Sequence, residues 1–365
     1  MDDKLIEPWG IDLTLHDELY VPEYITELAY EVVKSYDFAV RDMQVMATKP
    51  FKGGAIWKLE TTKGPKSLKL LHRRPSRSLF SLAAQEYLVE VKKARVPSIV
   101  QSKSGSNFVE RGGKLWFVAE WIVPLEPVND NLEGAKLLCH ALGEFHYLTS
   151  GYKPPKQAEI SSRLYKWPKN YQKVIEKLDW FRQILTLYTE LPASNIIMSH
   201  LDFYEKQAKN SLERLNNSPY SELVKKGNVY WGLAHQDYGW SNAQMGPNGM
   251  WVIDLDGVSY DLPIRDLSKL ITGAMSGLAQ WDSTWVREMI QSYHEARPIP
   301  PELYEVLMID LSLPNEFYKN IKHMIYDPEL FLDEDLKSIV ESIVQLEDSK
   351  WKVLKEIEQD WKGEK

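Results

Sequence analysis

Residues 233–249 read "LAHQDYGWSNAQMGPNG" and continue directly into "MWVIDLDG" at 250–257, and this stretch decides the fold. It brings together polar side chains that can bind a metal or accept a proton, which are His235, Asp237, Asn242, Asp254 and Asp256. The "GPNG" sequence at 246–249 is typical of a turn, because these residues tolerate unusual backbone angles. Short strand-like runs flank it, so the stretch predicts a β-hairpin.

The predicted hairpin places Asn242 beside Asp254, because Asn242 enters its first strand and Asp254 leaves its second. An amide oxygen and a carboxylate are suitable ligands for Mg²⁺ when a phosphate supplies the others. Asp237 lies on the loop before the hairpin, where a carboxylate can accept a proton from a substrate hydroxyl. His235 is expected to brace this loop by hydrogen bonding. The alternative is an acidic turn without function, but the apolar "WVI" run leading straight into Asp254 favours a site.

A second His-x-Asp, "SHLD" at 199–202, is not interpreted as a site. Apolar residues recur through it at helical spacing and predict a helix over 194–215. Ser194 is the expected N-cap of this helix. His200 and Asp202 would then stand two positions apart and not face each other. We interpret them as polar side chains that flank a buried helical stripe.

The composition is that of an ordinary soluble protein. A chain of 365 residues suits two packed domains or lobes. The single cysteine, Cys139, excludes an internal disulfide and a cysteine-based zinc site. No apolar run has the ~18 residues that a membrane span needs, and the acidic start lacks the apolar region of a signal peptide. We therefore expect a cytoplasmic protein that does not bind membranes.

Charge is unevenly distributed along the chain. The net charge is −8, yet residues 40–125 carry 16 lysines and arginines against 6 acidic residues. This basic block is expected either to attract phosphate groups or to be the lysine-rich outer surface of a sheet. The acidic balance of the whole chain argues against general binding of nucleic acids.

The spacing of apolar residues changes once along the chain. Between residues 40 and 122, five short strand-like runs alternate with glycine-containing turns, and one helix is predicted at 78–94. Another helix precedes the strands. After Trp121 the pattern is mainly helical, except around the hairpin. The sequence thus predicts an α+β protein, with an antiparallel sheet lobe at 1–121 and a helical lobe at 122–365.

These features together resemble a known family. The order His-x-Asp-x-x-x-x-Asn, hairpin and Ile-Asp, which ends at Asp254, resembles the catalytic and metal motifs of aminoglycoside phosphotransferases and choline kinases. Those proteins are small-molecule relatives of protein kinases, so the resemblance implies a two-lobed protein-kinase-like fold. The segments "LKLL", "AEWI", "EFH", "HQD" and "IDLD" follow one another in the order most similar to bacterial spore-coat CotS-like proteins.

The resemblance implies a nucleotide site in the first lobe. Lys69 looks like the phosphate-binding lysine, and Glu86, or else Glu90, looks like its partner on the following helix. The backbones of Glu120 and Ile122 would meet the adenine of ATP. From the residues alone, a lysine within the apolar "SLKLL" either extends its charge outward or finds a carboxylate partner. The chain departs from the family in its glycine loop, which has only one Gly-Gly pair.

The resemblance also implies a catalytic and metal site in the second lobe. Asp237 would orient and deprotonate the acceptor hydroxyl, and Asn242 and Asp254 would hold Mg²⁺. Asp256 is either a second metal ligand or only a cap for the turn at Gly257. These roles follow the chemistry of phosphoryl transfer, in which the charge on the moving group must be neutralised.

Two functions are compatible with the sequence. The first is an ATP- and Mg²⁺-dependent phosphotransferase that acts on a hydroxyl group of a small molecule. The second is a kinase-fold structural component of a spore coat, with weak or no catalysis and with other coat proteins as partners. Either would be made in the cytoplasm of the mother cell and could be assembled into the coat. The acidic, aromatic-rich second lobe suits a cationic or sugar-like acceptor, but the same composition also describes plain helical packing.

Overall fold

The computed structural model describes residues 4–10, 19–191, 193–331 and 334–363. Contacts divide the chain into two compact units. The first unit comprises residues 1–128, 151–161 and 235–259, and the second comprises residues 129–150, 162–234 and 260–365. The sequence predicts a single boundary after Trp121 between the sheet and the helices. The contacts instead assign residues 235–259, which contain the hairpin, to the first unit.

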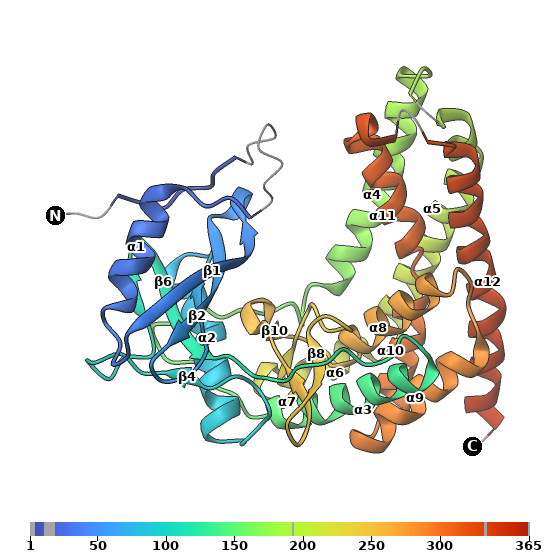
Figure 1. The fold of residues 1–365 in the computed structure, drawn as a ribbon. Helices are drawn as coiled ribbons and strands as arrows, with labels where there is room; N and C mark the ends of the chain where they lie inside the picture. The colour runs from blue at the N-terminus through green and yellow to red at the C-terminus, as the bar shows by residue number, and fades with distance from the viewer. Residues whose placement is uncertain (1–3, 11–18, 192, 332–333, 364–365) are drawn as a thin grey trace. The chain divides into compact units, whose positions relative to one another are not determined.

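The first unit is built on an antiparallel sheet of six strands (Figure 1). Its main path runs β1–β2–β3–β6–β4, and β5 also pairs with β6. The strands span Val40–Lys49 (β1), Gly54–Thr61 (β2), Lys66–Leu70 (β3), Ile99–Val100 (β4), Val109–Arg111 (β5) and Lys114–Glu120 (β6). The predicted antiparallel sheet is confirmed, and β4 is the strand that the sequence does not predict, because two residues are too few for an alternation.

Two helices cover opposite faces of this sheet. α1 (Glu23–Val33) packs its buried residues against Trp57 and Trp116, whose rings stack 5.6 Å apart. α2 (Pro75–Glu90) packs Leu82 against Phe117 on the other face. Neighbouring residues of β6 therefore point to opposite sides, as side chains along a strand must. This alternation decides which residues can face a ligand on the α2 side.

The predicted hairpin is present. β8 (Ala243–Gly246) pairs with β9 (Gly249–Val252), and the ladder leaves a two-residue turn between them. Asn248 in this turn has a φ of 65°, a left-handed conformation that asparagine adopts more readily than most residues. An isolated bridge between Glu126 and Met245 ties β8 to the chain that follows the sheet.

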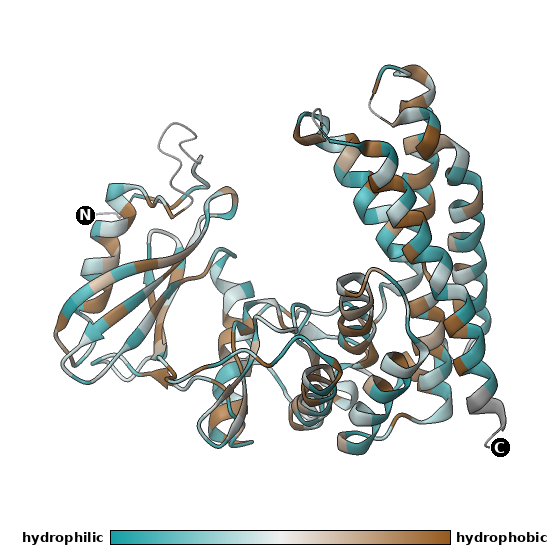
Figure 2. Ribbon diagram, turned by 45° about the vertical axis from the view of Figure 1, so that its right-hand side comes forward, coloured by the Kyte–Doolittle hydropathy of each residue, from teal (hydrophilic) through white to brown (hydrophobic). Residues whose placement is uncertain are grey.

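The second unit is mainly helical (Figure 1). Its helices span Leu132–Thr149 (α3), Trp167–Leu187 (α4), Ser194–Asn217 (α5), Tyr220–Lys225 (α6), Asn228–Trp231 (α7), Ile264–Gly277 (α8), Ser283–Ala296 (α9), Pro301–Ser312 (α10), Asn315–Tyr326 (α11) and Leu336–Gly363 (α12). Figure 2 shows hydrophobic and hydrophilic segments alternating around its long helices, as expected when one face of each is buried.

Shorter elements complete the chain. They are the 3₁₀ turns η1 (Pro50–Lys52), η2 (Leu255–Gly257) and η3 (Pro328–Phe331) and the two-residue strands β7 (Leu233–Ala234) and β10 (Ser259–Tyr260). The sequence does not predict α6, α7 or α11. The first two have six and four residues, which is too short for a helical period to be recognised.

The upstream His-x-Asp lies within α5, as predicted. The buried residues of α5 include Leu201, next to both polar residues in the chain. Asp202 is exposed and pairs with Arg182 at 2.7 Å. Ser194 is already the first helical residue and so is not the N-cap, and its hydroxyl donates to the carbonyl of Leu191. His200 and Asp202 thus belong to the surface of an ordinary packed helix.

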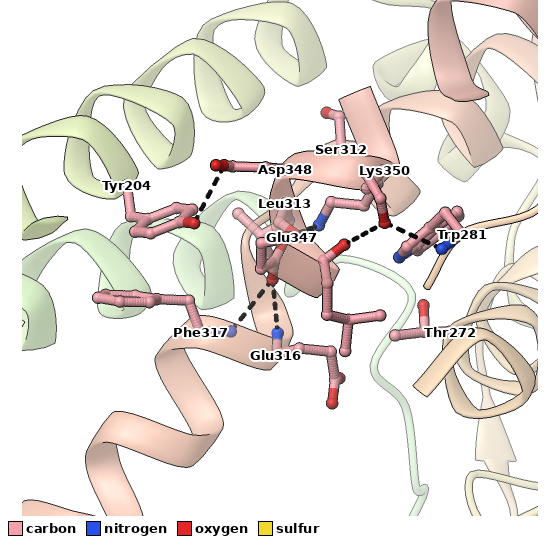
Figure 3. Close-up of polar contacts among 12 residues, drawn as sticks. Tyr204, Thr272, Trp281, Ser312, Leu313, Glu316, Phe317, Glu347, Asp348 and Lys350 are labelled. Carbon is pink, nitrogen blue, oxygen red and sulfur yellow. Dashed lines mark hydrogen bonds and ion pairs between the residues drawn. The ribbon is translucent and has the colours of Figure 1, made fainter. Parts of the chain in front are cut away.

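A buried ion pair on α12 fastens the end of α10 to the start of α11 (Figure 3). The Oε1 atom of Glu347 accepts from the backbone N–H groups of Glu316 and Phe317, 2.9 and 3.1 Å away. Lys350 pairs with Glu347 and donates to the carbonyl of Leu313 at 3.0 Å. The side chains of the pair are 1% and 2% exposed. Glu347 therefore supplies the cap that the N-cap residue of α11 does not provide.

Candidate functional site

Lys69 lies on β3 and points to the α2 face of the sheet. Its neighbours Leu68 and Leu70 pack into the core on the α1 side, so the alternation of the strand turns Lys69 the other way. The Nζ atom of Lys69 pairs with the carboxylates of Asp254 and Asp256, the second at 2.9 Å. Asp254 is 185 positions away in the sequence. The lysine has thus found carboxylate partners, which is one of the two arrangements expected for it.

The backbone after β9 presents both carboxylates to the lysine. Asp254 has a φ of 57° and a ψ of 57°, a left-handed conformation that precedes η2. Asp256 lies within η2, and its side chain is 11% exposed. Non-glycine residues held in this conformation cost about 1–3 kcal/mol each and are concentrated at functional sites. The bend therefore fits a role in placing charged groups.

The charges of this cluster determine the pKa of Asp254. Burial alone would raise the pKa of its carboxyl, but the positive charges of Lys69 and Lys49 outweigh burial and lower the pKa to about 2. The Nζ atom of Lys49 lies 3.8 Å from this carboxylate. For Lys69, burial alone would lower the pKa, but the carboxylates of Asp256 and Asp254 outweigh burial and raise it. Lys69 and Asp254 therefore stabilise each other's charged forms.

We expect this cluster to make stability depend on pH between about 4 and about 2. The pKa of Asp254 is lowered from 3.8 to about 2 in the folded protein. A lowered pKa stabilises the fold above the unfolded pKa, and this contribution is lost as the pH falls through the folded pKa. The shift corresponds to about 2 kcal/mol. Urea unfolding of the wild type and of Asp254→Asn should give a difference in unfolding free energy that shrinks by this amount toward pH 2. A difference that stays constant would contradict the lowered pKa.

His235 braces the loop that carries Asp237, as predicted. It is fully buried, its Nε2–H group donates to the carbonyl of Ile253 at 2.9 Å, and its Nδ1 atom accepts from the N–H group of Asp237 at 3.3 Å. Gln236 between them has a φ of 75°, which is unusual for a glutamine. The imidazole therefore joins the loop to the end of the hairpin, and Asp237 remains exposed.

Asn242 connects Asp237 to the open end of the hairpin. Its Nδ2 group donates to the backbone carbonyl of Asp237 at 2.8 Å and to the Oδ2 atom of the same residue at 3.4 Å. Its own carbonyl accepts from the N–H group of Ile253 at 2.9 Å, one residue before Asp254. Because its amide nitrogen faces Asp237, the Oδ1 atom of Asn242 is left as the side-chain acceptor. The structure thus brings Asp237, Asn242 and Asp254 onto one scaffold.

A cavity of about 400 Å³ adjoins the Lys69 cluster within the first unit. Its walls on the sheet side are mainly apolar and include Ile56, Phe117 and Ala119. Lys69 and Asp254 lie on its lining, as do Glu120 and Ile122 at the end of β6. The volume and the mixture of apolar walls with a few charged groups are typical of a small-molecule site.

The end of β6 contributes backbone groups to this cavity. The N–H group of Glu120 already donates to the carbonyl of Ser98 at 2.9 Å, and its side chain pairs with Lys66 at 2.8 Å. In the described part of the chain, the N–H group of Ile122 has no backbone partner. A planar ring in the cavity would therefore find an available donor at Ile122, whereas Glu120 could offer only its carbonyl.

The structure does not bring Glu86 or Glu90 to Lys69. Among the described residues, the ion partners of Lys69 are the two aspartates, whereas Glu90 is exposed and pairs with Lys93 at 3.8 Å. Glu86 is also exposed. Successive residues on a helix are rotated by about 100°, so Gln85 and its neighbour Glu86 point in different directions. Gln85 is the one that is buried and lines the cavity. The expected lysine–glutamate pair is therefore absent from this structure, and Asp254 and Asp256 take its place.

The donors available for a metal are oxygen atoms from two elements. Among the described residues, no group of three or more histidine, cysteine, aspartate or glutamate side chains is arranged to hold a metal ion. Asn242 and Asp254 supply an amide and a carboxylate at the same end of the hairpin, with Asp256 next to Lys69. Mg²⁺ commonly takes one or two carboxylates and completes its shell with substrate phosphates and water. This donor set fits Mg²⁺ bound together with a nucleotide.

The sheet with its buried lysine and the hairpin with its carboxylates define a protein-kinase-like phosphotransferase fold. The profile of the family described as "spore coat putative kinase YutH" matches residues 73–357, and the chain belongs to that family. The resemblance seen in the sequence is thereby confirmed. Over 333 residues the chain is 27% identical to spore coat protein S of Bacillus subtilis (strain 168), covering 91% of this chain and 94% of that one.

Solved structures agree with this fold. An aminoglycoside phosphotransferase from Alicyclobacillus acidocaldarius superposes with a TM-score of 0.73 at 18% identity, covering 93% of this chain and 96% of its own. The amicoumacin kinase hAmiN, solved with AMP-PNP, Ca²⁺ and Ami, gives a TM-score of 0.58 at 15% identity, covering 90% and 94%. Identities this low establish the fold alone. No helix in the described residues is long and apolar enough to cross a membrane.

Proposed function

We propose that this protein is an ATP- and Mg²⁺-dependent phosphotransferase that acts on a hydroxyl group of a small molecule and is associated with the spore coat. One observation carries the proposal. Lys69 and Asp254 meet at the wall of the cavity, with Asp256 paired to Lys69 beside them, on the scaffold where Asn242 binds Asp237. Phosphoryl transfer requires such an arrangement of a cation for phosphate oxygens, oxygen ligands for a metal and a carboxylate for the acceptor.

Each part of the cluster has a separate task in this proposal. Lys69 binds phosphate oxygens of the nucleotide, whose adenine lies in the apolar part of the cavity and accepts from the N–H group of Ile122. Asn242 and Asp254, with Asp256, would hold Mg²⁺, which neutralises charge on the phosphates. Lys69 is buried, so its charge acts at low dielectric and is little screened by salt.

Asp237 is the proposed catalytic base. Its carboxylate is exposed, so an acceptor hydroxyl can reach it, and Asn242 fixes one of its oxygens. His235 holds the backbone of the same residue. A base that is fixed on both sides keeps its orientation while it accepts the hydroxyl proton, which contributes about 10²–10⁴-fold to the rate in comparable reactions.

We expect Mg-ATP to raise the melting temperature of the purified protein by several degrees. A ligand at 100 times its dissociation constant stabilises the folded state by about 2.7 kcal/mol. Asp254→Ala should abolish the shift, because it removes a proposed metal ligand that also faces Lys69. Thermal unfolding with and without millimolar Mg-ATP measures both effects.

A matched substitution on the same unit controls for general effects of losing a carboxylate. Asp42→Ala removes an exposed aspartate of β1 and should leave the shift unchanged. If the wild type shows no shift at millimolar nucleotide, the nucleotide-dependent function is excluded. If Asp254→Ala retains the full shift, its role as a metal ligand is excluded.

The second candidate function is a structural component of the spore coat with weak or no catalysis. The absence of a glutamate partner for Lys69 among the described residues, together with the poor glycine loop, favours it. Both candidates are compatible with the family. A screen of sugars and amino alcohols as phosphate acceptors separates them: turnover with any acceptor supports the enzyme, whereas nucleotide binding without turnover supports the structural component.

A further inference from the structure

The second unit contains a cavity of its own, with a volume of about 290 Å³. The first turns of α4, α8 and α11 contribute to its lining. Its lining includes four cationic side chains, which are Arg163, Lys173, Arg265 and Lys319. One acidic residue, Asp261, also lines it. The acidic character of the second unit as a whole therefore does not extend to this cavity.

The acidic groups at the cavity are already engaged. Asp261 accepts from the indole N–H group of Trp167 at 2.7 Å and from the backbone N–H group of Leu262 at 2.9 Å. Asp310, behind the lining, is fully buried and accepts from the hydroxyl of Tyr171 at 2.7 Å. Both carboxylates are therefore already hydrogen-bonded to groups of the same unit.

Arg265 is only partly satisfied by these acids. Its Nη1 group donates to both carboxylate oxygens of Asp310, at 2.6 and 2.8 Å. Within the described parts of the chain, its Nε and Nη2 groups have no hydrogen-bond partner. The guanidinium also stands 5.7 Å from the centre of the Trp167 ring. An arginine fixed on one edge with donors left on the other is well suited to bind a carboxylate or phosphate.

Two of the three other cations at the lining add positive charge without an ion partner in the described residues. Lys319 pairs with Glu316 at 2.9 Å. For the residues that the structure describes, Arg163 and Lys173 form no ion pair. Lys269, one turn after Arg265 on α8, is half-buried, and burial together with the charges of Arg265 and Arg163 outweighs the charge of Asp266 and lowers its pKa. Positive charges are therefore crowded on this side of the unit.

The helices at the cavity act in the same direction. α4 has 21 residues and α8 has 14, and the first turn of each contributes to the lining. The N-terminus of a helix carries a partial positive charge that favours anions within its first turn. The first N–H groups of α11 are already bound by Glu347, so α11 contributes less.

We infer that this cavity binds a small organic anion. Its phosphate or carboxylate group lies among Arg163, Lys173 and Arg265, and its apolar or aromatic part lies against Val174 and Tyr318, which also line the cavity. A volume of about 290 Å³ is at the lower end of the range for small-molecule sites, which selects a compact ligand. This inference does not depend on the proposed phosphotransfer.

Calorimetric titration of the full-length protein with phenyl phosphate tests the inference. We expect binding in the wild type and an affinity lower by about tenfold or more in Arg163→Gln/Lys173→Gln, because charge-assisted hydrogen bonds are lost. Neither side chain forms an ion pair in the described structure, so this variant should fold normally. The control Lys206→Gln/Lys355→Gln changes the net charge equally on exposed positions outside the lining, and should bind as the wild type does.

Further titrations identify the ligand class and the site. Benzoate distinguishes a carboxylate preference from a phosphate preference, and choline, as a cation, should not bind at this cavity. Lys69→Met removes the phosphate-binding group of the first unit, so binding that survives in this variant belongs to the cavity. No binding of either anion to the wild type, or equal loss in the control variant, would overturn the inference. Binding that is lost in Lys69→Met and intact in the cavity variant would also overturn it.

Discussion

Asp237→Asn is expected to lower the rate of phosphoryl transfer by about 10²–10⁴-fold while nucleotide binding stays intact. The asparagine has the same shape, and its Oδ1 atom can still accept from the Nδ2 group of Asn242, as the carboxylate does. What is lost is the carboxylate that takes the proton from the hydroxyl group of the phosphate acceptor. The measurement is turnover of ATP with an acceptor found in the screen, together with the Mg-ATP-dependent shift in melting temperature.

Two comparisons make this result specific. Asp42→Asn makes the same chemical change at an exposed position of β1 and should leave turnover unchanged. A fall in turnover with an unchanged thermal shift identifies Asp237 as a catalytic group and not a binding group. Full turnover in Asp237→Asn would exclude it as the base, and a lost thermal shift would mean that it belongs to the nucleotide site.

Lys350→Met is expected to have the largest effect on stability, a loss of about 3–5 kcal/mol. Methionine fills a similar volume, but the substitution leaves the carboxyl group of Glu347 buried at 1% exposure without its cation. It also leaves the carbonyl of Leu313 without the donor that Lys350 supplies at 3.0 Å. Urea unfolding gives the free energy, and the rings of Trp281 and Trp351, 5.8 and 4.8 Å from the Nζ atom, provide a local fluorescence signal.

The control for this prediction lies on the same helix. Lys337→Met makes the same change where the side chain is 75% exposed and its pair with Glu341 is 3.8 Å long. An exposed pair of this kind contributes about 0–1 kcal/mol, so the control should unfold almost as the wild type does. Equal unfolding free energies for the two variants would show that the buried pair does not stabilise the junction of α10 and α11.

The hairpin and its loop could be predicted because their signals are local. Turn residues and a strand alternation lie within a few positions of each other, so the sequence shows where Asn242 enters and where Asp254 leaves. The brace at His235 follows from the same stretch. The assignment of the upstream His-x-Asp to a packed helix is equally local, since the helical period runs through both residues.

Features that depend on helix phase or on distant contacts could not be predicted. Gln85 and Glu86 are adjacent, and only the packing of α2 on the sheet decides which of them lines the cavity. Glu347 and Lys350 are spaced as an ordinary surface pair on a helix, yet they are buried because α10 and α11 cover them. The cationic cavity draws its residues from segments between Arg163 and Lys319, so no pattern in the sequence could have indicated it.

The cluster of Lys69 with Asp254 and Asp256 has a consequence for how the proposed metal and nucleotide would bind. A cation alone must compete with Lys69 for the carboxylates, and a polyphosphate alone must separate the lysine from them and leave buried negative charge unbalanced. A metal ion bound to a polyphosphate carries both a positive and a negative charge. The metal ion can then pair with the aspartates while the phosphate pairs with Lys69. Under the proposed function we therefore expect Mg²⁺ and nucleotide to bind with positive cooperativity, each strengthening the affinity for the other by the same factor.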